Sequence, residues 1–276
     1  PLLPAAHGDT RGARGAAATR TPSAPPPAPR AAFVAIGDEL LAGRTADTNL
    51  PWLARALQAR GAELVRAEFV PDEIDAIADS LTRCRAAVGE SGIVVTSGGI
   101  GPTHDDVTYE AVAQWAGVGL SLHEPTVDKM RAHYEPQGKE LNAARLRMAT
   151  LPDGARVLET PGTWVPIADV RGVWVLPGIP RLFTQMISAN VERFQGDAVE
   201  VVTLYTATGE GDLADALRAV AEAHAAGVAI GSYPATKSGA QYTTKITVSS
   251  RDPEALAAAT EAVRSAIDVS DAPLAS

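Results

Sequence analysis

Two adjacent carboxylates stand in a glycine-rich stretch, TSGGIGPTHDDVT, which runs from Thr96 to Thr108. An apolar run of strand length precedes it and an amphipathic run follows, so it is predicted to join a strand to a helix. Glycines let the backbone approach a ligand closely, and amides at a helix N-terminus bind anions. Asp105 and Asp106 would repel such an anion unless a hydrated divalent cation bridges them to its phosphates. The stretch therefore suggests a metal-assisted phosphate site.

Helix capping is a simpler explanation of the two aspartates. Thr103 is a favourable N-cap residue, and Asp106, three residues later, resembles the acid of a capping box. Acids in the first turn also interact with the helix dipole, by about 0.3–1 kcal/mol each. The spacing GGxGPT matches neither a Walker P-loop nor a GxGxxG fingerprint. For this stretch taken alone, both explanations stay open.

Three further polar loops follow apolar runs of strand length. Their acids could hold a metal or orient a water molecule, and a glycine could let the backbone approach a ligand. Each loop also has a structural explanation, as a helix cap or a plain strand-to-helix turn. The three loops are GDELLAGRTADTN (Gly37–Asn49) with Asp38, VPDE (Val70–Glu73) with Asp72, and LPGIP (Leu176–Pro180) with Gly178.

An alternation of strands and helices must position these loops. Runs of strand length are followed by amphipathic runs with helical spacing, which predicts βαβ units, a mostly parallel sheet and the α/β class. Ligands bind such a sheet at the carboxyl ends of its strands, where we expect the four loops to meet. The predicted strands are Ala31–Ile36, Ala62–Val70, Ile93–Thr96 and Val173–Leu176, and the predicted helices are Leu50–Gly61, Ile74–Val88, Val107–Gly117 and His123–Leu151.

The pattern changes near Val201, which predicts a second domain. From there the chain reads as strand, helix, strand, strand and helix, an order that suggests a small α+β domain. We expect a leader over residues 1–30, the α/β domain over residues 31–198 and the small α+β domain over residues 199–276.

Composition argues against several function classes. The formal net charge is −9, so no basic nucleic-acid-binding surface is expected. No apolar run approaches the roughly 18 residues of a membrane span, and the single cysteine, Cys84, cannot form a disulfide within the chain. Residues 1–30 are rich in Ala, Pro and Arg, which fits either the remnant of a transit peptide or a flexible leader without a targeting function. We expect a location in the cytoplasm or in an organelle, a plastid or a mitochondrion.

Taken together and in order, these loops resemble one family. The segments GDELLAGRTADTN, VPDE, TSGGIGPTHDDVT, LNAARLRMATLP and LPGIP are similar to motifs of the MoaB/Mog-like molybdopterin-binding family. Within it, the chain is more similar to the N-terminal domain of CinA proteins and the molybdopterin-binding-like domain of eukaryotic FAD synthases. TGEGDLADAL (Thr208–Leu217) and IGSYP (Ile230–Pro234) resemble segments of the small module that follows in CinA proteins. The resemblance implies a three-layer MoaB/Mog-like fold followed by a small α+β domain.

The resemblance implies two kinds of chemistry at one site. Adenylyltransferases of the family bind a pterin phosphate and a nucleotide with magnesium, and use acids at the positions of Asp72 and Asp106. The CinA and FAD synthase relatives are linked to metal-dependent hydrolysis of dinucleotides such as ADP-ribose or FAD. Asp105 stands where the adenylyltransferases typically carry arginine, and this reversal of charge favours hydrolysis.

We therefore expect a metal-dependent nucleotide pyrophosphatase. Asp72 would orient or deprotonate the attacking water, and Asp106, with Asp105 or Asp38, would hold a divalent metal such as Mg²⁺. Molybdopterin adenylyl transfer and a non-catalytic domain that binds a pterin or nucleotide stay open as alternatives. The expected partners are such a small molecule and further copies of the chain, with no nucleic acid and no membrane. The expected ligand-binding residues are Asn49, Ser97, Gly98, Gly99, Gly101, Thr103, Asn142, Arg145, Pro177, Gly178 and Pro180.

Overall fold

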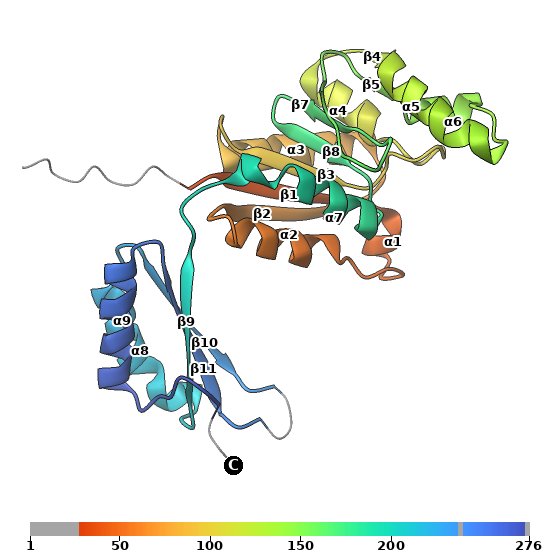
Figure 1. The fold of residues 1–276 in the computed structure, drawn as a ribbon. Coiled ribbons are helices and arrows are strands. Elements are labelled where there is room, and N and C mark those ends of the chain that lie inside the picture. Colours follow the sequence, from red (N-terminus) through yellow and green to blue (C-terminus); the bar gives the residue numbers. More distant parts are fainter. Residues whose placement is uncertain (1–27, 237–239, 274–276) are drawn as a thin grey trace, which may run out of the picture.

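The larger domain is built on one mixed sheet, drawn in Figure 1. The computed structural model describes residues 28–236 and 240–273. The strand order is β2-β1-β3-β8-β7-β6; pairings among the first four strands are parallel, while β7 pairs antiparallel with both neighbours. The mostly parallel sheet that the sequence predicts is therefore confirmed. The strands are β1 (Arg30–Ile36), β2 (Glu63–Val70), β3 (Ile93–Ser97), β6 (Arg156–Leu158), β7 (Ile167–Val170) and β8 (Val173–Leu176).

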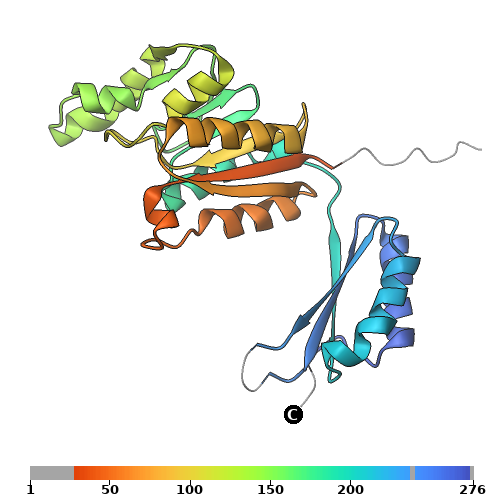
Figure 2. The same ribbon diagram turned by 180° about the vertical axis from the view of Figure 1, so that it is seen from behind.

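Helices cover both faces of this sheet and enclose two apolar cores (Figures 1 and 2). Side chains of β1 alternate between the two cores. Phe33 clusters with Leu53 and Phe183, whereas Val34 clusters with Ile77 on the other face. Such burial on both faces is typical of a parallel strand between helix layers, and it fixes the position of the strand's carboxyl end. The helices are α2 (Asn49–Gln58) and α7 (Pro180–Ala189) on one face, and α3 (Ile74–Val88) and α4 (Thr108–Ala116) on the other.

A separate subdomain interrupts the larger domain between residues 120 and 152. The stretch His123–Leu151 is largely helical, as predicted, but it is divided into two helices joined by a 3₁₀ turn and flanked by a strand pair. Pro136 and the left-handed Gly138 (φ 67°) interrupt the helical backbone. Its elements are β4 (Leu120–Leu122), α5 (Glu124–Tyr134), the 3₁₀ turn η1 (Glu135–Gln137), α6 (Ala143–Arg147) and β5 (Thr150–Pro152), which pairs antiparallel with β4.

The small domain has the element order that the sequence predicts. Its antiparallel sheet has the order β10-β11-β9, and two helices pack on one face of it (Figure 1). Arg251 joins it to the larger domain, because its guanidinium donates to the carbonyl of Gly61 (2.9 Å) and to Oε1 of Glu63 (3.1 Å). The elements are β9 (Glu200–Thr206), α8 (Glu210–Ala223), β10 (Val228–Pro234), β11 (Thr244–Ser250) and α9 (Pro253–Ala266).

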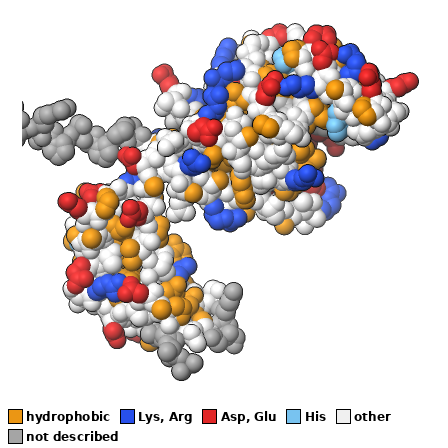
Figure 3. All heavy atoms as spheres, in the orientation of Figure 1, with side chains coloured by type: hydrophobic (Ala, Val, Ile, Leu, Met, Phe, Trp, Pro, Cys, Tyr) orange, Lys and Arg blue, Asp and Glu red, His pale blue; other side chains and the backbone are white. Residues whose placement is uncertain are grey.

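The surface agrees with the acidic composition. On the face shown in Figure 3, Lys and Arg side chains are interspersed with Asp and Glu, without a broad basic area. Among the described residues, no helix has the length and apolar character needed to cross a bilayer. Arg30, which the sequence assigns to the leader, is the first residue of β1. The other residues of the predicted leader, up to residue 27, lie outside the described part of the chain.

Candidate functional site

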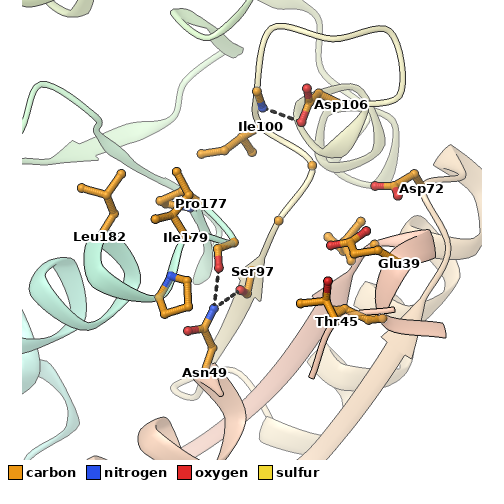
Figure 4. A pocket seen from close by; sticks show the side chains of 18 of the residues that line it. Glu39, Thr45, Asn49, Asp72, Ser97, Ile100, Asp106, Pro177, Ile179 and Leu182 are labelled. Carbon is orange, nitrogen blue, oxygen red and sulfur yellow. Dashed lines mark hydrogen bonds between the residues drawn. The ribbon is translucent and has the colours of Figure 1, made fainter. Parts of the chain in front are cut away.

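A cavity of about 570 Å³ lies at the carboxyl edge of the parallel strands (Figure 4). As predicted, all four polar loops contribute to its lining, because β1, β2, β3 and β8 end side by side at this edge. A volume of this size suits a ligand of nucleotide dimensions. The predicted residues that line the cavity are Asn49, Asp72, Ser97, Gly98, Gly99, Gly101, Asp105, Asp106, Pro177, Gly178 and Pro180.

The glycine-rich loop folds back on the end of β1. Gly98 (φ 112°) and Gly99 (φ 64°) have left-handed backbones, and a Cβ atom on Gly98 would lie 2.2 Å from the carbonyl oxygen of Ile36. Thr108 closes the loop, since its amide donates to the Gly99 carbonyl and its hydroxyl to the Gly98 carbonyl, both at 2.9 Å. The helix therefore begins at Thr108, and the prediction that Thr103 caps it is wrong.

Asp106 organises the loop from within. Its Oδ1 accepts a hydrogen bond from the amide of Gly101 (2.6 Å), and its Oδ2 accepts from the amide (2.8 Å) and the hydroxyl of Thr103. Both oxygens thus serve the loop backbone, and these two amides are not available to a phosphate. Thr103, which was predicted to bind the ligand, is exposed and does not line the cavity.

Arg147 supports the loop from α6, although sequence reasoning selected Arg145 instead. The Arg147 guanidinium donates to the carbonyls of Thr103 and Asp106 (2.8 Å to the latter) and to Glu110 (3.0 Å). Arg145 and Asn142 do not line the cavity. The Asn142 side chain accepts from the Arg145 amide (3.0 Å) and so caps α6, which occupies the side chain that was expected to touch a ligand.

Asp72 is the best placed of the cavity acids to accept a proton. Its Oδ2 accepts from the backbone amide of Asp38 (2.9 Å), and its carboxylate lies beside Gly99. Burial raises the pKa of Asp72, the charges of Asp38, Glu39 and Asp105 raise it further, and the Asp38 amide partly offsets this. In contrast, the pKa of the exposed Asp105 is lowered, chiefly by the Thr103 hydroxyl. The two acids therefore differ in proton affinity, as a general base and a metal ligand would.

The lining also revises the predicted metal ligands. Within residues 28–236 and 240–273, no group of three or more His, Cys, Asp or Glu side chains could hold a metal by itself. Glu39, which was not predicted, lines the cavity together with Asp105. Asp38, which was predicted as a possible metal ligand, does not line the cavity, and its backbone amide donates to Asp72. Mg²⁺ commonly takes one or two carboxylates and completes its coordination with water and ligand phosphates, and the acids present fit that arrangement.

Asn49 connects two of the loops. Its side chain is 3% exposed, and its Nδ2 donates to Oγ of Ser97 and to the carbonyl of Gly178, both at 2.9 Å. Its Oδ1 is buried and has no hydrogen-bond partner in the described part of the chain. Asn49 therefore fixes the separation of the β3 end and the Pro177–Pro180 turn across the floor of the cavity.

Replacement of Asn49 by alanine is expected to lower the free energy of unfolding by about 1–3 kcal/mol, because the buried Ser97 hydroxyl and the partly buried Gly178 carbonyl lose their donor. Nucleotide binding should weaken at the same time, since the two loops lose their common contact. Thermal unfolding and calorimetric titration would measure both effects. Asn190→Ala is a matched control: it removes one buried bond to the Met186 carbonyl (3.1 Å) outside the cavity. Equal loss of binding in both variants would contradict a local role for Asn49.

The wall opposite the acids is apolar, and sequence reasoning did not find it. Figure 4 shows Ile179 and Leu182 on one side of the cavity and Glu39 and Asp72 on the other. Ile179 is 59% exposed, so its side chain is open to a ligand in the cavity. The other apolar or aromatic side chains of the lining include Leu40, Ile100, Tyr134, Met148, Trp164 and Val165.

Comparison with known proteins agrees with this geometry. Residues 32–195 match the family model of the probable molybdopterin binding domain, and residues 198–272 match that of the FAD synthase middle domain. A protein of Aeropyrum pernix is 43% identical over 156 residues, which cover 55% of this chain and 57% of that protein. A CinA-like protein of Salinibacter ruber is 33% identical over 168 residues, which cover 59% of this chain and 40% of that protein. The chain thus spans about half the length of these two relatives.

A solved structure supports the same assignment. The crystal structure of CinA from Thermoplasma acidophilum, described as a protein with unknown function, is 32% identical in sequence and has a TM-score of 0.54. The match covers 60% of this chain and 98% of that chain. Because the first family model matches more than half of the chain, the protein belongs to the family of probable molybdopterin binding domains.

Proposed function

We propose that this chain is a metal-dependent nucleotide pyrophosphatase that acts on a dinucleotide such as FAD or ADP-ribose. The observation that carries the proposal is the charge of the lining. It contains Glu39, Asp47, Asp72, Asp105 and Asp106 but, as far as the described residues go, no Lys, Arg or His. A site of this kind binds phosphates only when a cation neutralises them. The glycine-rich loop and the family membership support phosphates as part of the ligand.

Asp105 and Glu39 are the residues with which the chain would hold the divalent cation. The oxygens of Asp106 already accept hydrogen bonds from the loop, so we assign that residue to loop structure instead. A bound divalent cation supplies charge neutralisation and polarises phosphorus–oxygen bonds. This assignment keeps Asp105 as a metal ligand, as predicted, and replaces the predicted second ligand, Asp106, by Glu39.

Asp72 would accept the proton of the attacking water. Its raised pKa gives it the proton affinity that this role requires. The water oxygen forms a bond to one phosphorus, the bridging phosphorus–oxygen bond breaks, and its electron pair leaves with the second phosphate. FAD would thus give AMP and FMN, and ADP-ribose would give AMP and ribose 5-phosphate.

The same lining disfavours adenylyl transfer. In that reaction a pterin phosphate attacks the nucleotide in place of water. Asp105, which stands where the adenylyltransferases typically carry arginine, would repel this anion at close range, whereas neutral water meets no such barrier. The match of residues 198–272 to the FAD synthase middle domain supports FAD as the first substrate to test.

Release of AMP tests the proposal. The purified chain would be incubated with FAD or ADP-ribose and with Mg²⁺, Mn²⁺ or Co²⁺, and AMP would be followed by chromatography. We expect release with metal and none with a chelator. Asp215→Asn, an acid on α8 whose partner is Arg218, is a control that should leave the rate unchanged. Binding without AMP release would indicate a non-catalytic domain, and no release from either dinucleotide with any of the metals would refute the proposal.

A further inference from the structure

We infer that Trp164 and Tyr134 form a subsite for a planar heteroaromatic ring, so that the ligand of this cavity carries such a ring next to its phosphates. The inference rests on the proposed function, because it assumes that the phosphates lie at the glycine-rich loop. Both side chains line the cavity, and neither belongs to the four polar loops.

The two rings form one continuous aromatic surface. Their centroids are 5.9 Å apart and their planes are inclined by 55°. Both are partly exposed, and Met148 lines the cavity beside them. A thioether is polarisable and adapts to the outline of a ring, so this group suits a flat, aromatic ligand better than an aliphatic one.

This surface is held in place before any ligand binds. The guanidinium of Arg145 lies 5.1 Å from the centre of the Tyr134 ring, an attractive cation–π contact. Trp164 packs on the apolar cluster of Val127, Met130 and Ala149. Its loop is tied to α7, because Nε2 of Gln185 donates to the carbonyl of Pro161 (2.7 Å). A rigid aromatic surface costs little conformational entropy when a ring stacks on it.

The composition of the lining defines the class of substrate. It combines acids and the glycine-rich loop with this aromatic surface. A ligand that fills about 570 Å³ therefore needs a charged part and a flat apolar part. Nucleotides satisfy this requirement, whereas inorganic pyrophosphate and sugar phosphates do not. Adenine and a flavin share the flat ring, so the chemistry of the surface fits both.

Binding of reaction products tests the inference without depending on turnover. AMP, FMN and ribose 5-phosphate would be titrated calorimetrically into the full chain with Mg²⁺. We expect Trp164→Leu to lower the affinity for AMP or FMN by about 5- to 150-fold, the range expected when one base–aromatic stacking contact is lost. Trp164→Phe should retain most of the affinity, and ribose 5-phosphate should bind equally to all variants. The larger effect on AMP or on FMN identifies which ring is bound.

Tyr134→Leu provides a second variant, and Trp115→Leu, on α4 outside the cavity, provides a control that should bind like the wild type. Unchanged AMP and FMN affinity in the Trp164→Leu and Tyr134→Leu variants would overturn the inference, as would an equal loss for ribose 5-phosphate. Binding that depends on the ring, without hydrolysis, would support the subsite and refute only the pyrophosphatase activity. Hydrolysis that neither substitution changes would support the pyrophosphatase activity and refute the subsite.

Discussion

Asp72→Asn is expected to lower kcat for dinucleotide hydrolysis by about 10²- to 10⁴-fold, the usual effect of removing a general base. The amide cannot take a proton from water, but its oxygen can still accept the hydrogen bond from the backbone of Asp38. The shape of the cavity should therefore be kept, and nucleotide affinity should change little. Rates measured at saturating substrate, together with titration of AMP, separate the two effects.

The raised pKa of Asp72 adds a pH signature. The base must be ionised, so activity should fall as the pH drops through a value above the ordinary 3.8. In the unfolded chain this carboxyl ionises at its ordinary, lower pKa. The cost of its charge in the fold is thus absent below that value and fully present above the raised pKa. At neutral pH, Asp72→Asn should therefore leave the unfolding midpoint unchanged or slightly raise it.

Asp75→Asn is a suitable control for this experiment. Asp75 lies in the first turn of α3, where its carboxylate accepts from Gln114 (2.8 Å), and it does not line the cavity. Its replacement should leave both the rate and the pH profile as in the wild type. Full activity of Asp72→Asn, or an acid limb of the pH profile that persists in it, would contradict the assigned role.

The elements that form the parallel part of the sheet were predictable because their order follows from the pattern of buried residues. In α3, Ile77, Leu81, Cys84 and Val88 recur at helical spacing and are all buried, and the predicted helix Ile74–Val88 has the observed bounds. The strand β1 is apolar almost throughout because it is covered on both faces. Parallel strands bring their carboxyl ends to one edge, so polar loops far apart in the sequence could be assigned to one cavity.

The individual roles of the site residues were not predictable in the same way. The distinction between Arg145 and Arg147 depends on which side chain of α6 faces a loop that lies about 40 residues earlier in the chain. Tyr134 and Trp164 are 30 residues apart, and an isolated aromatic residue in a sequence usually belongs to a core. Contacts of this kind arise from tertiary folding, and no local pattern of residue types records them.

Asp106→Asn is expected to destabilise the chain even when no metal is present. The carboxylate accepts from the amides of Gly101 and Thr103, whereas an amide has only one oxygen and must turn its NH₂ toward one of these donors. Loss of a hydrogen bond to a charged group costs about 1.5–3 kcal/mol. In a domain of this size the Tm should fall by about 3–12 °C, and nucleotide affinity should fall with it because the loop loses its shape.

Measurement of the Tm in a chelating buffer distinguishes this role from metal binding. If Asp106 served only as a metal ligand, its replacement would relieve repulsion among the cavity acids, and the metal-free Tm would stay the same or rise. If it organises the loop, the Tm falls whether or not metal is added. Asp105→Asn is the matched comparison: this exposed neighbour accepts no hydrogen bond from the amides of Gly101 and Thr103, so its metal-free Tm should fall less than that of Asp106→Asn, while its activity should be lost. A metal-free Tm that falls further for Asp106→Asn than for Asp105→Asn would assign the two adjacent carboxylates to different tasks, one to the loop and one to the ligand.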